Sequence, residues 1–395
     1  MRPFKSGYRV RSAFEVRTSF FVSTTSFPFR FLNTTTPRLF VAATQQNDGK
    51  TTTALGLFAA LRKRLGRIGF IKPVGQRFVE VEGQRIDEDS VLMDKTFTVH
   101  TPLEAMSPIA VEPDFTRRYI DNENNEFLVR RIQNSFDRAA WEKEFVIIEG
   151  TGHAGVGSVF DLSNARVARL LQSKVVLVVK GGIGRAIDEV ALNKALFDQE
   201  GVEVVGVIIN KILPEKFDSV RDFAQRGLAR LGIDLIGAIP DEPLLANATL
   251  GQICRSTRGD FINGKTRSRR RVQKVVIGAT NAGHAMDKLC PGTLVITPGD
   301  REDVILATLA TNGVEGGQQV AGLVLSSGLR PHQRVLDLLA ESDLPTITSQ
   351  LDSYSIANSI HSMTVKTLPG DVEKIDMIQS LIERHVEIER LLGKL

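Results

Sequence analysis

Residues 38–53 read RLFVAATQQNDGKTTT, and this stretch decides the fold. Its apolar run, residues 39–43, has the length of a buried strand, and a polar loop over residues 44–48 follows it. Beyond Gly49-Lys50-Thr51, an apolar-periodic run over 50–65 predicts a helix. A strand, such a loop and a helix build a phosphate cradle, because successive backbone N–H groups and the helix N-terminus present fixed positive dipoles to an anion.

In such a cradle the side chain of Lys50 reaches the β- and γ-phosphates of a nucleotide, and the Thr51 hydroxyl ligates Mg²⁺. The match to the usual pattern is incomplete, because its first glycine would fall at position 44, where this chain has Thr44. The alternative is a surface turn that holds an ordinary lysine. We favour the phosphate loop, since the strand ends at the right distance from Gly49, and we expect ATP and Mg²⁺ as cofactors.

The composition is that of an ordinary globular protein, with 395 residues, 42% hydrophobic and 24% charged. This length allows two domains. No apolar stretch approaches the roughly 18 to 20 residues that a membrane-spanning helix needs, so no membrane partner is expected. The two cysteines, Cys254 and Cys290, lie far apart and give neither a disulfide framework nor a metal-ligand spacing, which favours a reducing compartment.

The positive charge of the chain is concentrated at its start. The net charge is +4, but residues 1–37 alone carry +5, which leaves the remainder at −1. A nearly neutral body gives no reason to expect a nucleic-acid partner. The first 37 residues are rich in Arg and Ser and poor in acids, so they are either a transit peptide or an over-extended start; the next methionine is Met93. We expect residues 1–37 to be disordered. The protein is expected in the cytoplasm, or in a mitochondrion or plastid if the segment is a transit peptide.

Short apolar runs alternate with helical stretches from residue 38 to 243. This alternation predicts an α/β fold with a doubly wound, mostly parallel sheet of the P-loop NTPase type. Within it, residues 75–113 read as a long polar passage and residues 114–142 as one helical stretch.

The same rhythm continues less regularly beyond residue 243, and it predicts a second, smaller α/β domain over 244–365. A C-terminal helix is expected within 366–395, with Asp371 as its cap. We expect this helix to pack on the second domain or on a second subunit.

Polar side chains stand where several of the predicted strands end, and ligands of an open α/β sheet bind at that edge. Glu149 ends an apolar strand, and a carboxylate there holds Mg²⁺ directly or through water; the alternative is a solvated strand end. Lys72 either points into the ligand crevice or is solvated. Asp87 and Asp89 would face the same way on an extended segment and share a Mg²⁺, or they belong to a wet acidic loop. Asn210 either reads a purine edge or turns the chain.

One ordered set of these residues resembles dethiobiotin synthetase and its relatives over residues 38–243. The set is Thr44-Gln-Gln-Asn-Asp-Gly49-Lys50-Thr51, Lys72-Pro73-Val74, Asp89, Glu149-Gly-Thr-Gly152, Asn210 and Gly237-x-Ile-Pro240. The remainder resembles the domain named DRTGG, because of Pro298-Gly299-Asp300-Arg301 and the strand 322–325. A dethiobiotin-synthetase-like domain followed by DRTGG is found in the N-terminal part of long phosphate acetyltransferases.

The resemblance implies a role for each matched residue. Lys50 and Thr51 would hold the phosphates and Mg²⁺, and Lys50 and Lys72 would be the catalytic residues. Lys72 would steady the reacting carbamate and phosphate, and Asn210 would read adenine. Mg²⁺ would be held by Thr51, Asp89 and Glu149. The implied nucleotide-binding residues are Thr44, Asn47, Gly49, Lys50, Thr51, Thr52, Asn210 and Pro240.

Two functions stay open. After Lys72-Pro73 the small-residue substrate loop of that family is replaced by Gly75-Gln76-Arg77, so we favour a nucleotide-sensing regulatory module. The alternative is an ATP-dependent enzyme, a ligase or ATPase, that activates a carboxylate or similar small acceptor by phosphoryl transfer, of the dethiobiotin synthetase or cobyrinic acid amidating type. The expected partners are ATP, a small-molecule acceptor or a protein, and a second copy of the chain in a homodimer.

Overall fold

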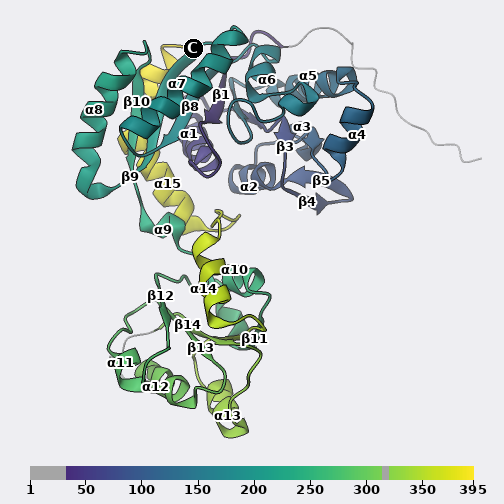
Figure 1. Ribbon diagram of the computed structural model, residues 1–395. Coiled ribbons are helices and arrows are strands. Elements are labelled where there is room, and N and C mark those ends of the chain that lie inside the picture. Colours follow the sequence, from purple (N-terminus) through teal and green to yellow (C-terminus); the bar gives the residue numbers. More distant parts are fainter. Residues whose placement is uncertain (1–32, 314–319) are drawn as a thin grey trace, which may run out of the picture. The chain divides into compact units, whose positions relative to one another are not determined.

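Six parallel strands form the larger sheet, in the order β10-β9-β8-β1-β7-β2 (Figure 1). The computed structural model describes residues 33–313 and 320–395. The strands are short apolar runs buried on both faces, as a parallel sheet between helices requires. This sheet confirms the predicted doubly wound fold. The six strands are β1 (Arg38–Ala43), β2 (Ile68–Ile71), β7 (Phe145–Glu149), β8 (Lys174–Lys180), β9 (Val204–Ile212) and β10 (Leu235–Pro240).

Alternate strand residues point to opposite faces of this sheet, and helices cover each face. In β1, Phe40 and Ala42 belong to one hydrophobic core, whereas Leu39 and Val41 belong to the other. The first core is covered by α4 (Phe115–Asp121), α5 (Glu126–Ala140), α6 (Asn164–Leu170), α7 (Gly184–Gln199) and α8 (Phe217–Ala229). The second is covered by α1 (Lys50–Leu65), α2 (Glu88–Phe97), α15 (Val372–His385) and α16 (Ile388–Leu392).

The C-terminal helices therefore pack mainly against α1 of the first domain, whereas we expected them on the second domain or on a second subunit. Only the start of α15 meets the second domain among the described residues, where Arg271 pairs with Asp371 and Glu373 at 3.6 and 3.4 Å. Gly56 permits the close approach of α1 and α15, because a Cβ on Gly56 would lie 2.2 Å from Ile382 Cγ1. Asp371 stands at the N-cap position of α15, but its carboxylate accepts a hydrogen bond from Leu368 N instead of capping the helix.

The polar passage 75–113 contains more regular secondary structure than the sequence indicated. It contains a β-hairpin of β4 (Phe78–Val81) and β5 (Gln84–Asp87), which turns at Glu82 and Gly83 with φ of 50° and 76°. Two successive positive φ values are those of a tight hairpin turn. The passage also holds β3 (Val74–Gly75), α2, α3 (Leu103–Met106) and β6 (Ile109–Ala110).

The helical stretch predicted over 114–142 is broken into α4 and α5. The break is the segment Asn122-Glu-Asn-Asn125, in which Asn124 Oδ1 accepts a hydrogen bond from Glu126 N at 3.1 Å. Asparagine side chains compete with the helix for backbone groups in this way, so the break has a local cause.

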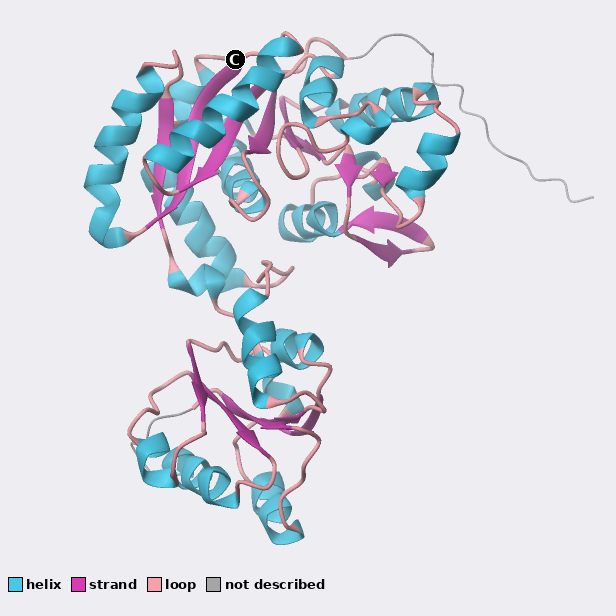
Figure 2. Ribbon diagram, in the orientation of Figure 1, coloured by secondary structure: helices cyan, strands magenta, loops and turns pink. Residues whose placement is uncertain are grey.

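A second sheet forms the predicted second α/β domain, with helices around it (Figure 2). It has five strands, in the order β11-β15-β14-β13-β12. Its strands are parallel except β11, which runs antiparallel to β15. Hydrophobic cores lie on both of its faces. Its strands are β11 (Asp260–Asn263), β12 (Lys274–Ile277), β13 (Thr293–Pro298), β14 (Gly322–Ser326) and β15 (Thr346–Thr348). Its helices are α10 (Leu250–Ser256), α11 (Ala282–Met286), α12 (Glu302–Gly313), α13 (Gln333–Glu341) and α14 (Ser353–Ser362); α9 (Pro243–Ala246) precedes them.

The expected disorder over 1–37 lies largely outside the described residues. Residues 33–37 are described and lie against the first domain: Asn33 N donates to Asp137 Oδ1 at 2.6 Å, and Val146 N donates to Pro37 O at 2.9 Å. Within 33–313 and 320–395, no helix is both long and apolar enough to cross a bilayer.

Candidate functional site

The carboxyl ends of the parallel strands of the first domain meet at one edge of its sheet, and a cavity of about 580 Å³ lies there. Almost every residue singled out in the sequence lines this cavity. The lining includes Asn47, Gly49, Lys50, Thr51, Thr52, Lys72, Asp89, Glu149, Asn210 and Pro240. The exception is Thr44, the first residue of the loop, which is 2% exposed and does not line the cavity. The topology thus brings residues that are up to 193 positions apart in sequence, Asn47 and Pro240, to one place.

The conformation of the loop after β1 is stabilised by a buried carboxylate of the loop itself, that of Asp48. Asp48 Oδ2 accepts hydrogen bonds from Thr44 Oγ1 and from Gln45 N, both at 2.8 Å. Thr44 therefore positions the loop and does not line the cavity. Burial raises the pKa of Asp48, and the bond from Thr44 opposes that shift.

Gly49 and Asn210 fit against each other at the end of this loop. Gly49 has φ +101°, and a Cβ there would lie 2.0 Å from Asn210 Nδ2. The Asn210 amide donates to Asp48 O at 2.9 Å and accepts from Lys211 N at 2.9 Å. Asn210 thus fastens β9 to the loop, which is a role that the sequence did not suggest.

Lys50 is the first residue of α1, and its ammonium group turns back over the loop. Its Nζ lies 3.5 Å from Gln45 O. Burial lowers the pKa of Lys50 to about 8, and the Glu149 carboxylate opposes that shift. A cation held in this position, beside the free N–H groups of a helix N-terminus, is suited to an anionic ligand.

Lys72 lies among three carboxylates. Its Nζ is 3.2 Å from Asp87 Oδ1 and 3.6 Å from Glu149 Oε1, and it forms an ion pair and hydrogen bond with Asp89 Oδ2. Burial would lower the pKa of Lys72, but the three acids raise it well above its usual value. The same ion pair keeps the pKa of Asp89 at about 2, although burial would raise it.

Asp87 and Asp89 approach Lys72 for a reason other than the expected one. Asp87 is the N-cap of α2 and accepts a hydrogen bond from Asp89 N at 2.9 Å, so the pair begins a helix and does not lie on an extended segment. Burial raises the pKa of Asp87, and Lys72 opposes the shift.

Glu149 is deeply buried, at 1% exposed, as is Asp87. Its Oε1 accepts a hydrogen bond from Thr51 Oγ1 at 2.7 Å, whereas its Oε2 has no hydrogen-bond partner among the described residues. Burial raises the pKa of Glu149 to about 7, with Lys72 opposing. A buried carboxylate oxygen without a partner is costly, and a bound cation would remove that cost.

These donors fit a Mg²⁺ ion that is shared with phosphates. In the described ranges no group of three His, Cys, Asp or Glu converges as a complete metal cage. Mg²⁺ commonly takes only one or two carboxylates from the protein and fills its remaining positions with phosphate and water. The unpartnered oxygen of Glu149, next to the Thr51 hydroxyl, provides such a partial site.

One further cation reaches the acids from a distant part of the chain. Lys366 lies in the connecting segment, residues 363–371, between α14 and α15; its Nζ is 2.9 Å from Glu88 Oε2 and 3.5 Å from Asp89 Oδ1. Sequence reasoning missed Lys366, because an isolated lysine in an irregular segment carries no local signal.

Comparison with known proteins agrees with this architecture. The model of the AAA domain family AAA_26 matches residues 37–249, more than half of the chain. The chain belongs to this family. The model of the DRTGG domain matches residues 252–363. The predicted pair of a dethiobiotin-synthetase-like P-loop domain and a DRTGG domain is therefore confirmed, and we refer below to the AAA domain and the DRTGG domain.

The most similar relatives include phosphate acetyltransferases. The protein from Pseudomonas aeruginosa is 30% identical over 369 residues, which are 89% of this chain and 51% of the relative. The protein from Nitrosomonas europaea is 28% identical over 366 residues, 90% of this chain and 51% of the relative. The chain thus spans about half the length of the curated relatives it matches, and corresponds to their N-terminal half. Among solved structures, the MinC:MinD cell division complex of Aquifex aeolicus is 18% identical with a TM-score of 0.33, over 53% of this chain and 83% of that one.

Proposed function

We propose that the AAA domain binds Mg-ATP at the carboxyl edge of its sheet, and that the chain acts as a nucleotide-sensing regulatory module. The observation that carries the sensing role is the contact of Lys366 with Glu88 and Asp89, at 2.9 and 3.5 Å. It joins the segment that follows the DRTGG domain to Asp89, one of the acids that would hold the metal, and to its neighbour Glu88.

The binding role rests on the loop and on the groups around it. Lys50 and the N–H groups at the start of α1 would hold the phosphates. Thr51, Glu149 and Asp89 would hold Mg²⁺, which would neutralise the negative charge of the phosphates. Asn210 and Pro240 line the same cavity, and the base would lie against them.

The sensing role follows from competition between cations. In this structure Asp89 is paired with two lysines, Lys72 and Lys366. A divalent metal on the same carboxylate would repel both ammonium groups, and Lys366 is the one of the two that is free to leave, at 29% exposed against 9% for Lys72. The carbonyl of Lys366 also accepts a hydrogen bond from Gln252 Nε2 of α10, at 3.2 Å. Release of Lys366 would therefore also disturb this contact with α10 of the DRTGG domain.

The alternative, an ATP-dependent enzyme, is favoured by one observation: Lys72 directly follows β2 and lines the same cavity as the phosphate loop. A lysine in that position can hold an acceptor carboxylate against the terminal phosphate. The three acids that bind Lys72 would have to release it first, which weighs against this alternative.

One experiment separates the two functions. Backbone hydrogen exchange of residues 363–371 is measured with Mg-ATP and with ATP in chelator, and ATP consumption is followed with carboxylates and amines on offer. We expect faster exchange with Mg-ATP only, and ATP consumption at background. Unchanged exchange with bound Mg-ATP would contradict sensing, and acceptor-dependent turnover would establish the enzyme.

A further inference from the structure

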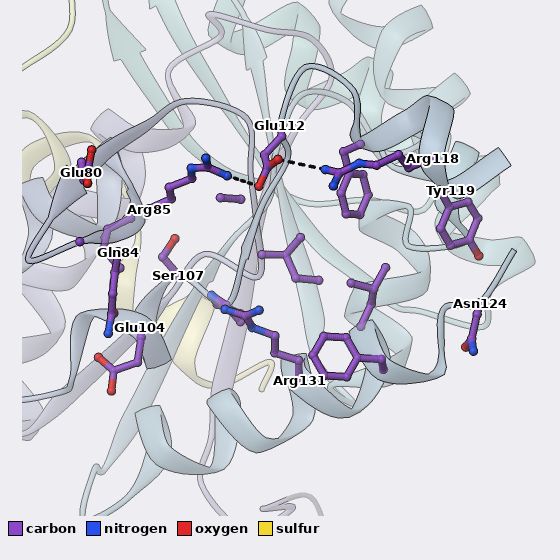
Figure 3. Close-up of a pocket in the computed structure, with 18 of the residues that line it drawn as sticks. Glu80, Gln84, Arg85, Glu104, Ser107, Glu112, Arg118, Tyr119, Asn124 and Arg131 are labelled. Atoms are coloured by element: carbon purple, nitrogen blue, oxygen red, sulfur yellow. Dashed lines mark hydrogen bonds and ion pairs between the residues drawn. The ribbon is translucent and has the colours of Figure 1, made fainter. Parts of the chain in front are cut away.

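A second cavity of about 900 Å³ lies in the AAA domain, and it shares no lining residue with the nucleotide cavity (Figure 3). Its walls are the β4–β5 hairpin, the segment 104–112 and the helices α4 and α5. The volume lies within the range of small-molecule sites, and neither the family match nor the proposed function assigns a ligand to it.

Three arginines from three different elements face this cavity: Arg85 from the hairpin, Arg118 from α4 and Arg131 from α5. Two of them are already neutralised, because Glu112 lies between Arg85 and Arg118 and pairs with both (Figure 3). This arrangement shows that arginines from separate walls can converge here on one carboxylate.

Arg131 is different, because it has no ion-pair partner within the described ranges. Its side chain points from α5 toward the middle of the cavity (Figure 3). Two more acids belong to the lining, and neither pairs with Arg131: Glu104 pairs with Arg138 at 2.7 Å, and Glu80 lies on β4 of the hairpin. A planar guanidinium with free donors is suited to a carboxylate or a phosphate.

The wall next to Arg131 is apolar. Phe115, Phe127 and Leu128 line it, and Phe127 is 66% exposed, so its ring is open to a ligand in the cavity. Phe115 is fixed by an edge-to-face contact with Phe160 at 5.3 Å. An unpaired cation beside exposed aromatic rings selects a ligand with an anionic head and an apolar body.

We propose that this cavity binds a small organic anion, a carboxylate or phosphate ester with an apolar body, through Arg131 and the rings of α4 and α5. The proposal does not depend on nucleotide binding. The site does adjoin the acid cluster, because Ile86 lines this cavity while the next residue, Asp87, lines the nucleotide cavity. Ser107 also lines this cavity, and its Oγ accepts the hydrogen bond from Asp87 N at 2.9 Å.

The test uses the whole chain with benzoate and phenyl phosphate as probes and neutral benzamide as the comparison, with binding followed by ligand-observed NMR titration. We expect both anions to bind saturably and benzamide to bind at least about tenfold more weakly. Arg131→Gln should weaken both anions about tenfold or more. Arg130→Gln is the matched control: Arg130 is the adjacent residue on α5, pairs with Glu126 at 3.4 Å and does not line the cavity, so binding should be unchanged.

A further variant separates this site from the phosphate loop. Lys50→Ala should leave the affinity for both probes unchanged, even if the proposed ATP site is lost. Three outcomes would overturn the proposal: equal binding to wild type and Arg131→Gln, equal binding of benzamide and benzoate, or probe binding that disappears in Lys50→Ala but persists in Arg131→Gln.

Discussion

The Thr51 hydroxyl donates a 2.7 Å hydrogen bond to Glu149 Oε1, and so joins the first turn of α1 to the end of β7. The two residues are 98 positions apart. Their contact brings the N-terminus of α1 and the carboxylate of Glu149, a group that can ligate Mg²⁺, into one corner of the cavity. The buried Glu149 Oε2, which lacks a partner in the described parts of the chain, lies in the same corner.

Replacing Lys50 tests the phosphate loop. Lys50→Ala removes the cation that turns back over the loop, and we expect the affinity for Mg-ATP to fall by about ten- to a hundredfold, as for loss of a charge-assisted hydrogen bond. Isothermal titration calorimetry measures the change. Lys63→Ala is the control, because Lys63 lies on the same helix but is exposed and pairs with Glu383. Equal losses in the two variants would contradict the assigned site.

The sequence predicted this loop well because its signal is local. Strand β1, the Gly-Lys-Thr turn and α1 are contiguous in sequence. The predicted bounds of the strand and of the helix agree closely with those of β1 and α1. Lys72 and Glu149 were found for a related reason: each directly follows or ends an apolar run, and the ends of parallel strands must share one edge.

The residues that the sequence did not reveal act across long distances or in polar segments. Lys366 reaches Asp89 from 277 positions away, and no pattern in one sequence encodes that contact. The hairpin before α2 mixes charged and apolar residues, and its Glu-Gly turn lacks the Asn-Gly or Asp-Gly pair that is the usual hairpin signal. We therefore interpreted it as part of a polar passage. The place of α15 also depended on tertiary packing, since its apolar face fits any partner of the right shape, and the close approach that Gly56 allows to Ile382 is not visible in the sequence.

Lys72 is predicted to hold the acid cluster together. Lys72→Met keeps the length of the side chain but leaves Asp87, Asp89 and Glu149 without their shared cation. Breaking a buried ion pair from one side costs about 3 to 5 kcal/mol of unfolding free energy. Because the unpaired acids can take up protons, this deficit should shrink as the pH falls from 8 to 5. Urea unfolding at both pH values measures it, and a deficit that is small or independent of pH would contradict the predicted role.

The pH dependence of stability should show the cost of ionising the buried carboxyl group of Glu149. Its pKa is raised to about 7 by burial, above the value near 4.5 of an unfolded chain, so the folded state prefers the protonated acid. Glu149 therefore lowers stability as the pH rises through 7 and has no such effect below about 4.5. Glu149→Gln keeps an acceptor for Thr51 and removes the charge.

We therefore expect Glu149→Gln to be more stable than wild type at pH 8, by roughly 3 kcal/mol for a shift of this size, and equal to it near pH 4.5. Thermal unfolding of both proteins without nucleotide measures the difference. Saturating Mg-ATP should abolish the advantage, because a cation next to the carboxylate favours its charged form. A variant less stable than wild type at pH 8 would contradict the assigned burial of a charge.

Gly49 and Gly83 form a matched pair for the last prediction. Both have positive φ, +101° and +76°, but a Cβ on Gly49 would lie 2.0 Å from Asn210 Nδ2, whereas a Cβ on Gly83 meets nothing within 4 Å. Gly83→Ala should therefore cost only the backbone strain, about 1 to 2 kcal/mol. Gly49→Ala should cost clearly more, because it also displaces the Asn210 amide that holds Asp48 O. It should also weaken Mg-ATP binding, which Gly83→Ala should leave unchanged. Denaturant unfolding and calorimetry of both variants test this, and equal effects would show that Asn210 does not fix the loop.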